Sequence, residues 1–60
     1  MRLLIEGVEI KRTYRIKVRP AGGRYEVSWF ELDPSERYVV SKHSMPMMRT
    51  AHGTYEWRAR

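Results

Sequence analysis

A regular alternation of apolar and polar side chains between Val8 and Val18 most constrains how this chain can fold. Over these eleven residues the even positions are apolar, with Arg12 as the exception, and the odd positions are polar. Strand side chains point to opposite faces with a period of two, whereas a helix needs apolar residues three or four apart. The pattern therefore predicts one long strand over 8–18, apolar on one face and polar on the other.

Turn-forming residues flank this strand on both sides. Before it, Glu6-Gly7 predicts a two-residue hairpin turn that pairs Ile5 with Val8, because glycine tolerates a positive φ. After it, the segment 20–23 contains proline and two glycines and predicts a four-residue turn into a second alternating strand. Both turns favour antiparallel neighbours.

The second turn fixes an expected register. If Arg19 lies opposite Arg24, then Arg12 lies opposite Glu31. The one charged residue at an apolar position of the strand would then have an acidic partner on the neighbouring strand. The segment 33–36, Asp-Pro-Ser-Glu, then has the residues that a type I turn prefers and predicts a third strand after it.

The periodicity disappears from Lys42 to Gly53, so we expect the stretch Ser44 to Met48 to form an ordered crossing or lid. Alternation returns at 54–60 and predicts a final strand. The whole chain, 1–60, is expected to be a single all-β domain: an antiparallel meander of four to five strongly curved strands without a helix. An eleven-residue strand would run roughly 36 Å if straight, so we expect the sheet to curl toward a small barrel.

The apolar positions of these strands share one face and are the expected core. Aromatic side chains at such inward positions are more often packing residues than a stacking platform for bases. The expected core residues are Leu3, Ile5, Val8, Ile10, Tyr14, Ile16, Val18, Tyr25, Val27, Trp29, Tyr38, Val40, Tyr55 and Trp57.

Length and composition argue against several classes of function. A chain of 60 residues buries only about 60% of its unfolded surface, so we expect neither a deep catalytic cleft nor a small-molecule substrate. With Cys 0 there is no disulfide framework and no thiolate nucleophile, which favours an intracellular, cytoplasmic setting. No apolar run approaches the roughly 20 residues of a membrane helix, and no apolar signal-peptide region follows Met1, so we expect neither a membrane span nor a signal peptide.

An excess of cations on the outer face gives the first functional hypothesis. Lys+Arg 12 against Asp+Glu 7 leaves a net charge of +5, and a basic strand surface can bind phosphate groups. We therefore expect a non-enzymatic module that docks on nucleic acid or a nucleoprotein surface; the alternative is a solvated face that keeps the protein soluble. The expected contact residues are Lys11, Arg15, Lys17, Arg19, Arg24, Arg58 and Arg60.

An apolar patch on the same outer face gives the second hypothesis, a protein-binding accessory or inhibitor of the kind mobile elements encode. Such patches often mark interfaces with a larger protein or with a second copy in a homodimer. Alternatively, the methionine segment folds back over the patch as a second small core. The residues concerned are Phe30, Leu32, Val39, Met45, Met47 and Met48.

Two histidines give a third hypothesis, a small metal-independent ribonuclease. His43 or His52 would serve as acid or base, and Arg49 or Arg58 would hold the scissile phosphate. The histidines lie nine residues apart without a third strong ligand at a recognised spacing, so we expect no metal site and no cofactor.

Overall fold

The structure is a computed structural model that describes residues 1–32 and 39–59, with the side chains of residues 39 and 40 left out. The expected all-β class is confirmed, and the described residues contain no helix. The strands are β1 (Arg2–Ile5), β2 (Val8–Glu9), β3 (Thr13–Ala21), β4 (Arg24–Leu32), β5 (Val39–Ala51) and β6 (Thr54–Trp57). The expected turn at 33–36, along with Tyr38 and the Val40 side chain, lies outside the described residues.

The strands form one mixed sheet in the order β2-β1-β6-β5-β4-β3. Neighbours are antiparallel except β1 and β6, which run parallel. The expected antiparallel meander of four to five strands is therefore corrected, because the sheet has six strands and one parallel pair. A parallel pair needs a long connection between its two strands, and the chain from β2 to β5 supplies it. The sheet is open, with β2 and β3 at its edges, so the expected curl does not close a barrel.

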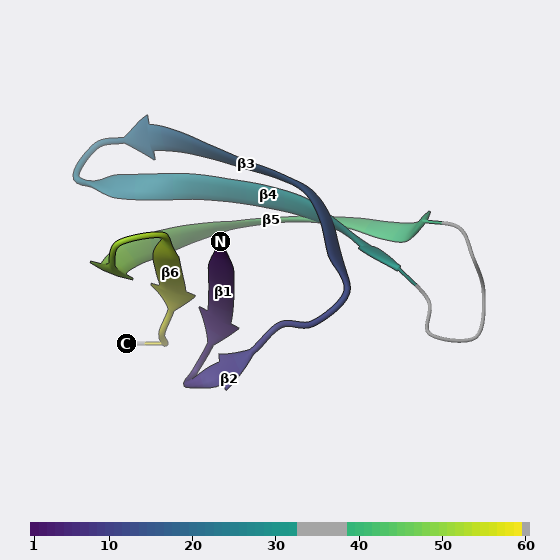
Figure 1. Cartoon of the computed structure of the whole chain (residues 1–60). Helices are drawn as coiled ribbons and strands as arrows, with labels where there is room; N and C mark the ends of the chain where they lie inside the picture. Colours follow the sequence, from purple (N-terminus) through teal and green to yellow (C-terminus); the bar gives the residue numbers. More distant parts are fainter. Residues whose placement is uncertain (33–38, 60) are drawn as a thin grey trace.

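Strand β5 holds two layers together. Its residues up to Met47 pair with β4, and those from Met48 onward pair with β6. A straight strand of this length would span roughly 40 Å, which exceeds the longest dimension of the molecule, 36 Å. Strand β5 therefore coils, and β1 and β6 cross beneath the layer formed by β3, β4 and β5 (Figure 1).

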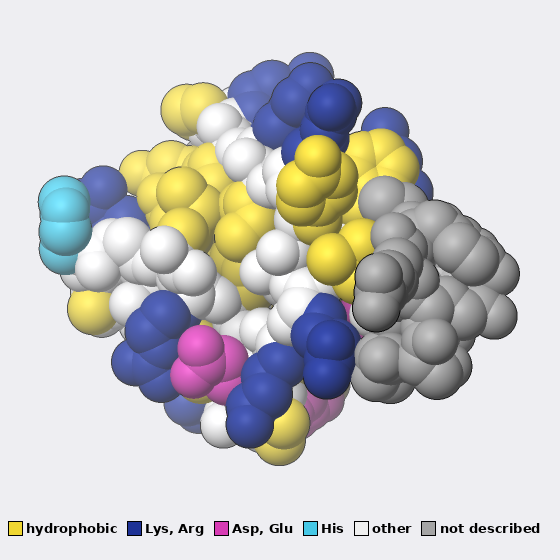
Figure 2. Space-filling model, turned by 45° about the vertical axis from the view of Figure 1, so that its right-hand side comes forward, with side chains coloured by type: hydrophobic (Ala, Val, Ile, Leu, Met, Phe, Trp, Pro, Cys, Tyr) yellow, Lys and Arg dark blue, Asp and Glu magenta, His cyan; other side chains and the backbone are white. Residues whose placement is uncertain are grey.

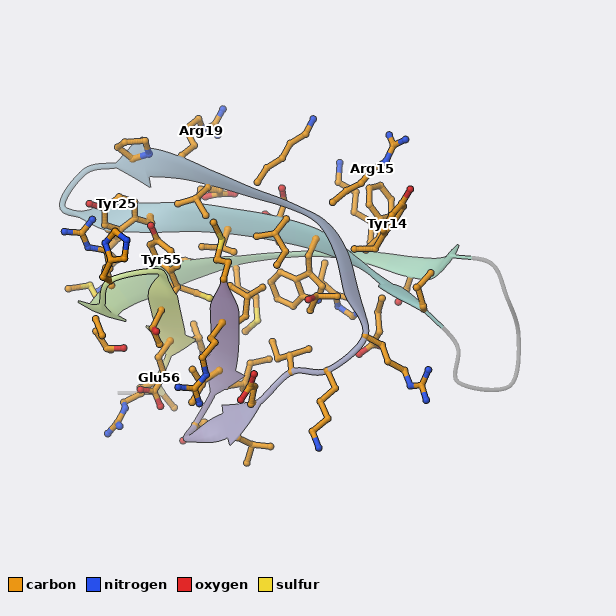
Figure 3. The ribbon with its side chains drawn as sticks, viewed as in Figure 1. Tyr14, Arg15, Arg19, Tyr25, Tyr55 and Glu56 are labelled. Carbon is orange, nitrogen blue, oxygen red and sulfur yellow. The ribbon has the colours of Figure 1, made fainter. Side chains whose placement is uncertain are left out.

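The core fills the space between the layers. Leu3, Val27, Trp29 and Met47 are almost completely buried, and Tyr55 is 8% exposed. The ring of Tyr25 meets that of Tyr55 edge-on, with 5.3 Å between centroids, and the two face each other across the layers in Figure 3. Further apolar side chains pack partly buried around this centre: Ile10, Ile16, Val18, Met45 and Trp57.

The expectation of an irregular crossing at 42–53 is wrong, because most of this segment is strand β5. Met47 points into the core and Met45 packs against it, whereas Ser44 and Pro46 are exposed. The segment therefore does alternate. Two features concealed the pattern: methionine is a weak strand signal, and proline within a run argues against a central strand. Pro46 lies beside the point where β5 changes partner from β4 to β6.

The long strand expected over 8–18 is also wrong, since the chain leaves the sheet between β2 and β3. The hairpin at Glu6-Gly7 is confirmed: Ile5 pairs with Val8. Beyond it, Arg12 has a positive φ of 59° and breaks the strand. Consequently β2 is short, and the side chain of Val8 is 70% exposed instead of belonging to the core.

The turn between β3 and β4 has two residues, not the expected four. Gly22 and Gly23 have φ values of 54° and 81°, as the favoured two-residue hairpin turns require. The shorter turn pairs Arg19 with Glu26 rather than with Arg24. The expected pairing of Arg12 with Glu31 is likewise replaced, because Thr13 lies opposite Glu31.

A β-bulge in β3 changes which face Tyr14 occupies. Tyr14 pairs with Phe30 and Lys17 pairs with Ser28, so β3 holds one residue more than β4 between these pairs. Arg15, within the bulge, has a positive φ of 54°. Tyr14 therefore leaves the core, where the alternation placed it, and is 45% exposed on the opposite face.

Two neighbouring methionines test this account of β5. Met47→Ala should lower the free energy of unfolding by about 2 to 5 kcal/mol, because it leaves a cavity in the core. Met48→Ala should change it by about 0.5 kcal/mol or less, since the Met48 side chain is 52% exposed. Urea unfolding followed by tryptophan fluorescence measures both. Equal effects at the two positions would contradict the described register of β5.

Candidate nucleic-acid interface

The outer face is the side of β3, β4 and β5 that points away from β1 and β6. Strand pairing aligns its side chains in three rows across the sheet. In Figure 3 Tyr14, Arg15 and Arg19 project from β3 on this side, away from the lower layer. The rows are Tyr14, Phe30 and Lys42; Lys17, Ser28 and Ser44; and Arg19, Glu26 and Pro46.

The middle of the outer face is hollowed. A hollow of about 280 Å³ is lined by Lys17, Arg19, Glu26, Ser28, Lys42 and Ser44. Three cations therefore face one carboxylate, and Ser44 Oγ donates a hydrogen bond of 3.0 Å to Glu26 Oε1. Ammonium, guanidinium and hydroxyl groups are the donors that proteins use to bind phosphate oxygens.

Aromatic rings flank the cations at one end of the outer face. Lys42 Nζ lies 5.8 Å from the centroid of the Phe30 ring, and Arg15 Cζ lies 5.6 Å from that of the Tyr14 ring. Both distances suit an attraction between a cation and the π face of a ring. Figure 2 shows Lys and Arg side chains gathered at the top of the molecule, beside hydrophobic surface.

The structure brings together only part of the expected basic set. Lys17 and Arg19 line the hollow, and Arg15 lies over Tyr14. Lys11 lies in the connection between β2 and β3, and Arg60 lies outside the described residues. Sequence reasoning missed Lys42, which it assigned to an irregular segment, although its alternation with Ser44 was a usable signal.

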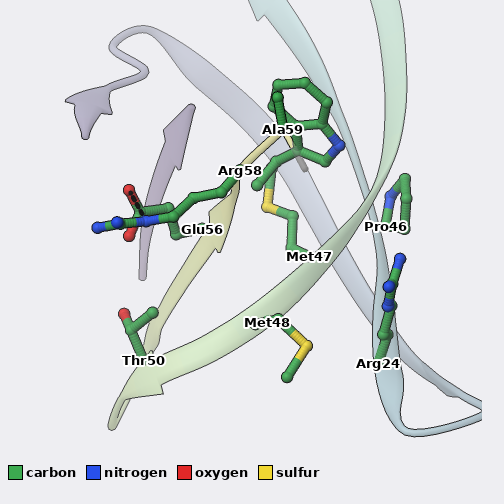
Figure 4. A pocket seen from close by; sticks show the side chains of 9 residues that line it. Arg24, Pro46, Met47, Met48, Thr50, Glu56, Arg58 and Ala59 are labelled. Atoms are coloured by element: carbon green, nitrogen blue, oxygen red, sulfur yellow. Dashed lines mark ion pairs between the residues drawn. The ribbon is translucent and has the colours of Figure 1, made fainter. Parts of the chain in front are cut away.

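Arg24 and Arg58 line a second hollow, of about 270 Å³, at the end of the molecule where β5 meets β6. Here Glu56 is buried, with 7% of its side chain exposed. Its Oε2 accepts a hydrogen bond of 2.8 Å from the backbone N–H of Gly7. The same oxygen forms an ion pair with Arg58 Nε at 3.1 Å, drawn as a dashed line in Figure 4. Arg58 thus neutralises a buried acid that ties the first hairpin to β6.

The expected protein-docking set does not gather on one surface. Met47 is in the core and Met45 packs against it. Met48 lines the second hollow. Phe30 and Leu32 are partly buried, and Val39 is the backbone partner of Leu32. The expected role of the methionines as a lid is therefore corrected, because their segment is a strand whose inward side chains build the core.

His43 takes part in packing beside the core. Its ring stacks on Trp29, with 5.3 Å between centroids. Its Nε2 lies 3.0 Å from Ser41 Oγ and 3.5 Å from Glu31 Oε2. A serine–histidine–acid relay uses the two different ring nitrogens, whereas here both neighbours approach the same nitrogen.

His52 lies in the turn after β5. The length of strand between His43 and this turn is roughly 25 Å. The structure therefore does not bring the two histidines together. In the ranges 1–32 and 39–59, no three His, Asp or Glu side chains come close enough to hold a metal ion.

The chain matches no protein-family model, no curated protein and no solved structure. The described part of the chain also contains no helix long and apolar enough to cross a membrane.

Glu56 and Arg58 allow a test of the second hollow. Glu56→Ala should lower the free energy of unfolding by about 2 kcal/mol, because the partly buried hydrogen bond from the Gly7 N–H loses its charged acceptor. Glu56→Gln, which keeps an acceptor, should cost less. Arg58→Ala should cost about 1 kcal/mol at most, since the guanidinium is 74% exposed. Urea denaturation measures all three. An Arg58→Ala effect as large as that of Glu56→Ala would contradict a larger contribution from the Gly7 hydrogen bond than from the ion pair.

Proposed function

We propose that this protein is a nucleic-acid-binding module whose outer face contacts the phosphate backbone. The observation that carries the proposal is the hollow in which Lys17, Arg19 and Lys42 converge from β3 and β5. These cations come from β3 and β5, which lie on opposite sides of β4. The fold therefore brings together positive charges that are far apart in the sequence. A nucleic acid that neutralises them releases its counterions, which drives association.

The geometry of the face suits a strand of phosphates more than a single anion. Lys17 and Arg19 lie on the same side of β3, roughly 7 Å apart, and Lys42 lies across the sheet on β5. Ser28, on β4 between them, adds a hydroxyl group, whereas the hydroxyl proton of Ser44 is donated to Glu26. Contacts of this kind position a nucleic acid without reading its sequence, so we expect weak sequence preference.

Docking on a larger protein through Phe30 remains the competing hypothesis. It has less support, because Met47 is buried and Met45 packs against the core, so neither is free to join Phe30 in one docking surface. On that hypothesis the cations would steer association without making it depend on nucleic acid.

Fluorescence anisotropy with a labelled oligonucleotide of about 16 nucleotides tests the proposal. The affinity should fall steeply between about 50 and about 200 mM salt. Lys17→Ala, Arg19→Ala and Lys42→Ala should each weaken binding and reduce the slope of log K against log salt by about one unit.

Arg2→Ala is the matched control. Arg2 carries the same charge on β1, where it pairs with Glu9 at 3.1 Å, away from the outer face. Its loss should leave the salt slope within error of the original value. A slope that falls equally for Arg2→Ala would mean that net charge, and not the outer face, causes binding. Absence of binding at low salt would overturn the proposal.

A further inference from the structure

The bulge in β3 exposes an aromatic side chain that the core could have used. Without the extra residue, Tyr14 would share the inward face of Ile16 and Val18. The bulge instead needs a left-handed backbone at Arg15, a conformation that costs free energy for a residue with a Cβ. A chain of 60 residues has little apolar surface to spare for its core, so an outward tyrosine calls for an explanation.

The bulge places Tyr14 directly opposite Phe30 on β4. Cross-strand partners have Cβ atoms about 5 Å apart, so the two side chains leave the sheet as neighbours on the outer face. Tyr14 is 45% exposed and Phe30 is partly exposed. The next row of the face begins with Lys17, at the edge of the basic hollow.

We propose that the ligand of the outer face is an unpaired nucleic-acid strand whose bases stack on Tyr14 and Phe30. This inference rests on the proposed function, because the same strand passes its phosphates over Lys17, Arg19 and Lys42. Arg15 and Lys42 lie over the two rings, so a stacking base would take their place on the rings and the displaced cations would contact the backbone beside it. Aromatic rings beside a basic groove are the general means of binding single strands without sequence preference.

A duplex does not fit this arrangement. Its bases are already stacked on one another and expose only their edges in the grooves, so they cannot lie on a ring held at a sheet surface. A duplex could contact only the cations. The inference therefore predicts a preference for single strands that depends on the two rings and not on the net charge.

Tyr14→Leu and Phe30→Leu test the stacking, because leucine keeps an apolar side chain and removes the ring. In anisotropy titrations at fixed salt, each should weaken binding of a mixed-sequence single strand by about 5- to 100-fold. The salt slope should not change, since no cation is lost. Val8→Leu, at an exposed apolar position on β2, is the control and should leave affinity unchanged.

A probe lacking bases repeats the test without changing the protein. An abasic oligonucleotide of equal length keeps every phosphate, so the unmodified protein should bind it about as weakly as the double variant Tyr14→Leu/Phe30→Leu binds the intact strand. That double variant should not distinguish the two probes. Phe30→Trp, which keeps a stacking surface, should retain affinity and so separates loss of the ring from damage to the sheet.

The outcomes separate the two proposals. If duplex, abasic and intact strands bind equally, and Lys17→Ala weakens all three, the outer face binds phosphates and the stacking inference is overturned. If no probe binds at low salt, both proposals fail. A single-strand preference that survives in the double variant would also overturn the role of Tyr14 and Phe30.

Discussion

The change of partner along β5 is the constraint on which the rest of the structure depends. A single flat sheet built from these strands would leave its apolar face in water, and the chain has no helix among its described residues to cover it. Because β5 pairs first with β4 and then with β6, the sheet folds across itself and buries Leu3 and Trp29 between its halves. Met47 lies where the halves meet, which is why its burial is nearly complete. The same fold leaves the other side of β3, β4 and β5 uncovered.

The sequence predicts those parts of the fold whose signals are local. The hairpin at Glu6-Gly7 and the final strand follow from turn residues and alternation alone. The bulge does not, because one extra residue in β3 moves Tyr14 to the other face while the alternation around it continues unbroken. The departure of Arg12 from the apolar pattern was the visible sign that the strand ends there. The expected register, which contains too long a turn, conceals this sign because it places Arg12 opposite Glu31.

The candidate site was predictable to a similar degree. Lys17 and Arg19 follow from strand periodicity, since both occupy the polar face of a strand. Lys42 and the paired rings of Tyr14 and Phe30 required knowledge of which strands are neighbours, and that depends on long-range contacts between β3, β4 and β5. Arg58 had the right charge but serves a buried carboxylate, a role that composition cannot distinguish from phosphate binding.

Strand β3 is an edge of the open sheet, so its side chains affect pairing with other chains as well as the proposed ligand binding. An edge strand exposes unpaired backbone groups that can template pairing with another chain, and proteins protect such edges with cations, bulges and proline. Strand β3 has all three in Lys17, the bulge at Arg15 and Pro20. The side chains that would hold a phosphate backbone therefore also oppose self-association. Removing these cations would therefore also remove a barrier to pairing between β3 edges of different molecules. A basic β3 is favourable for that reason even when no ligand is bound.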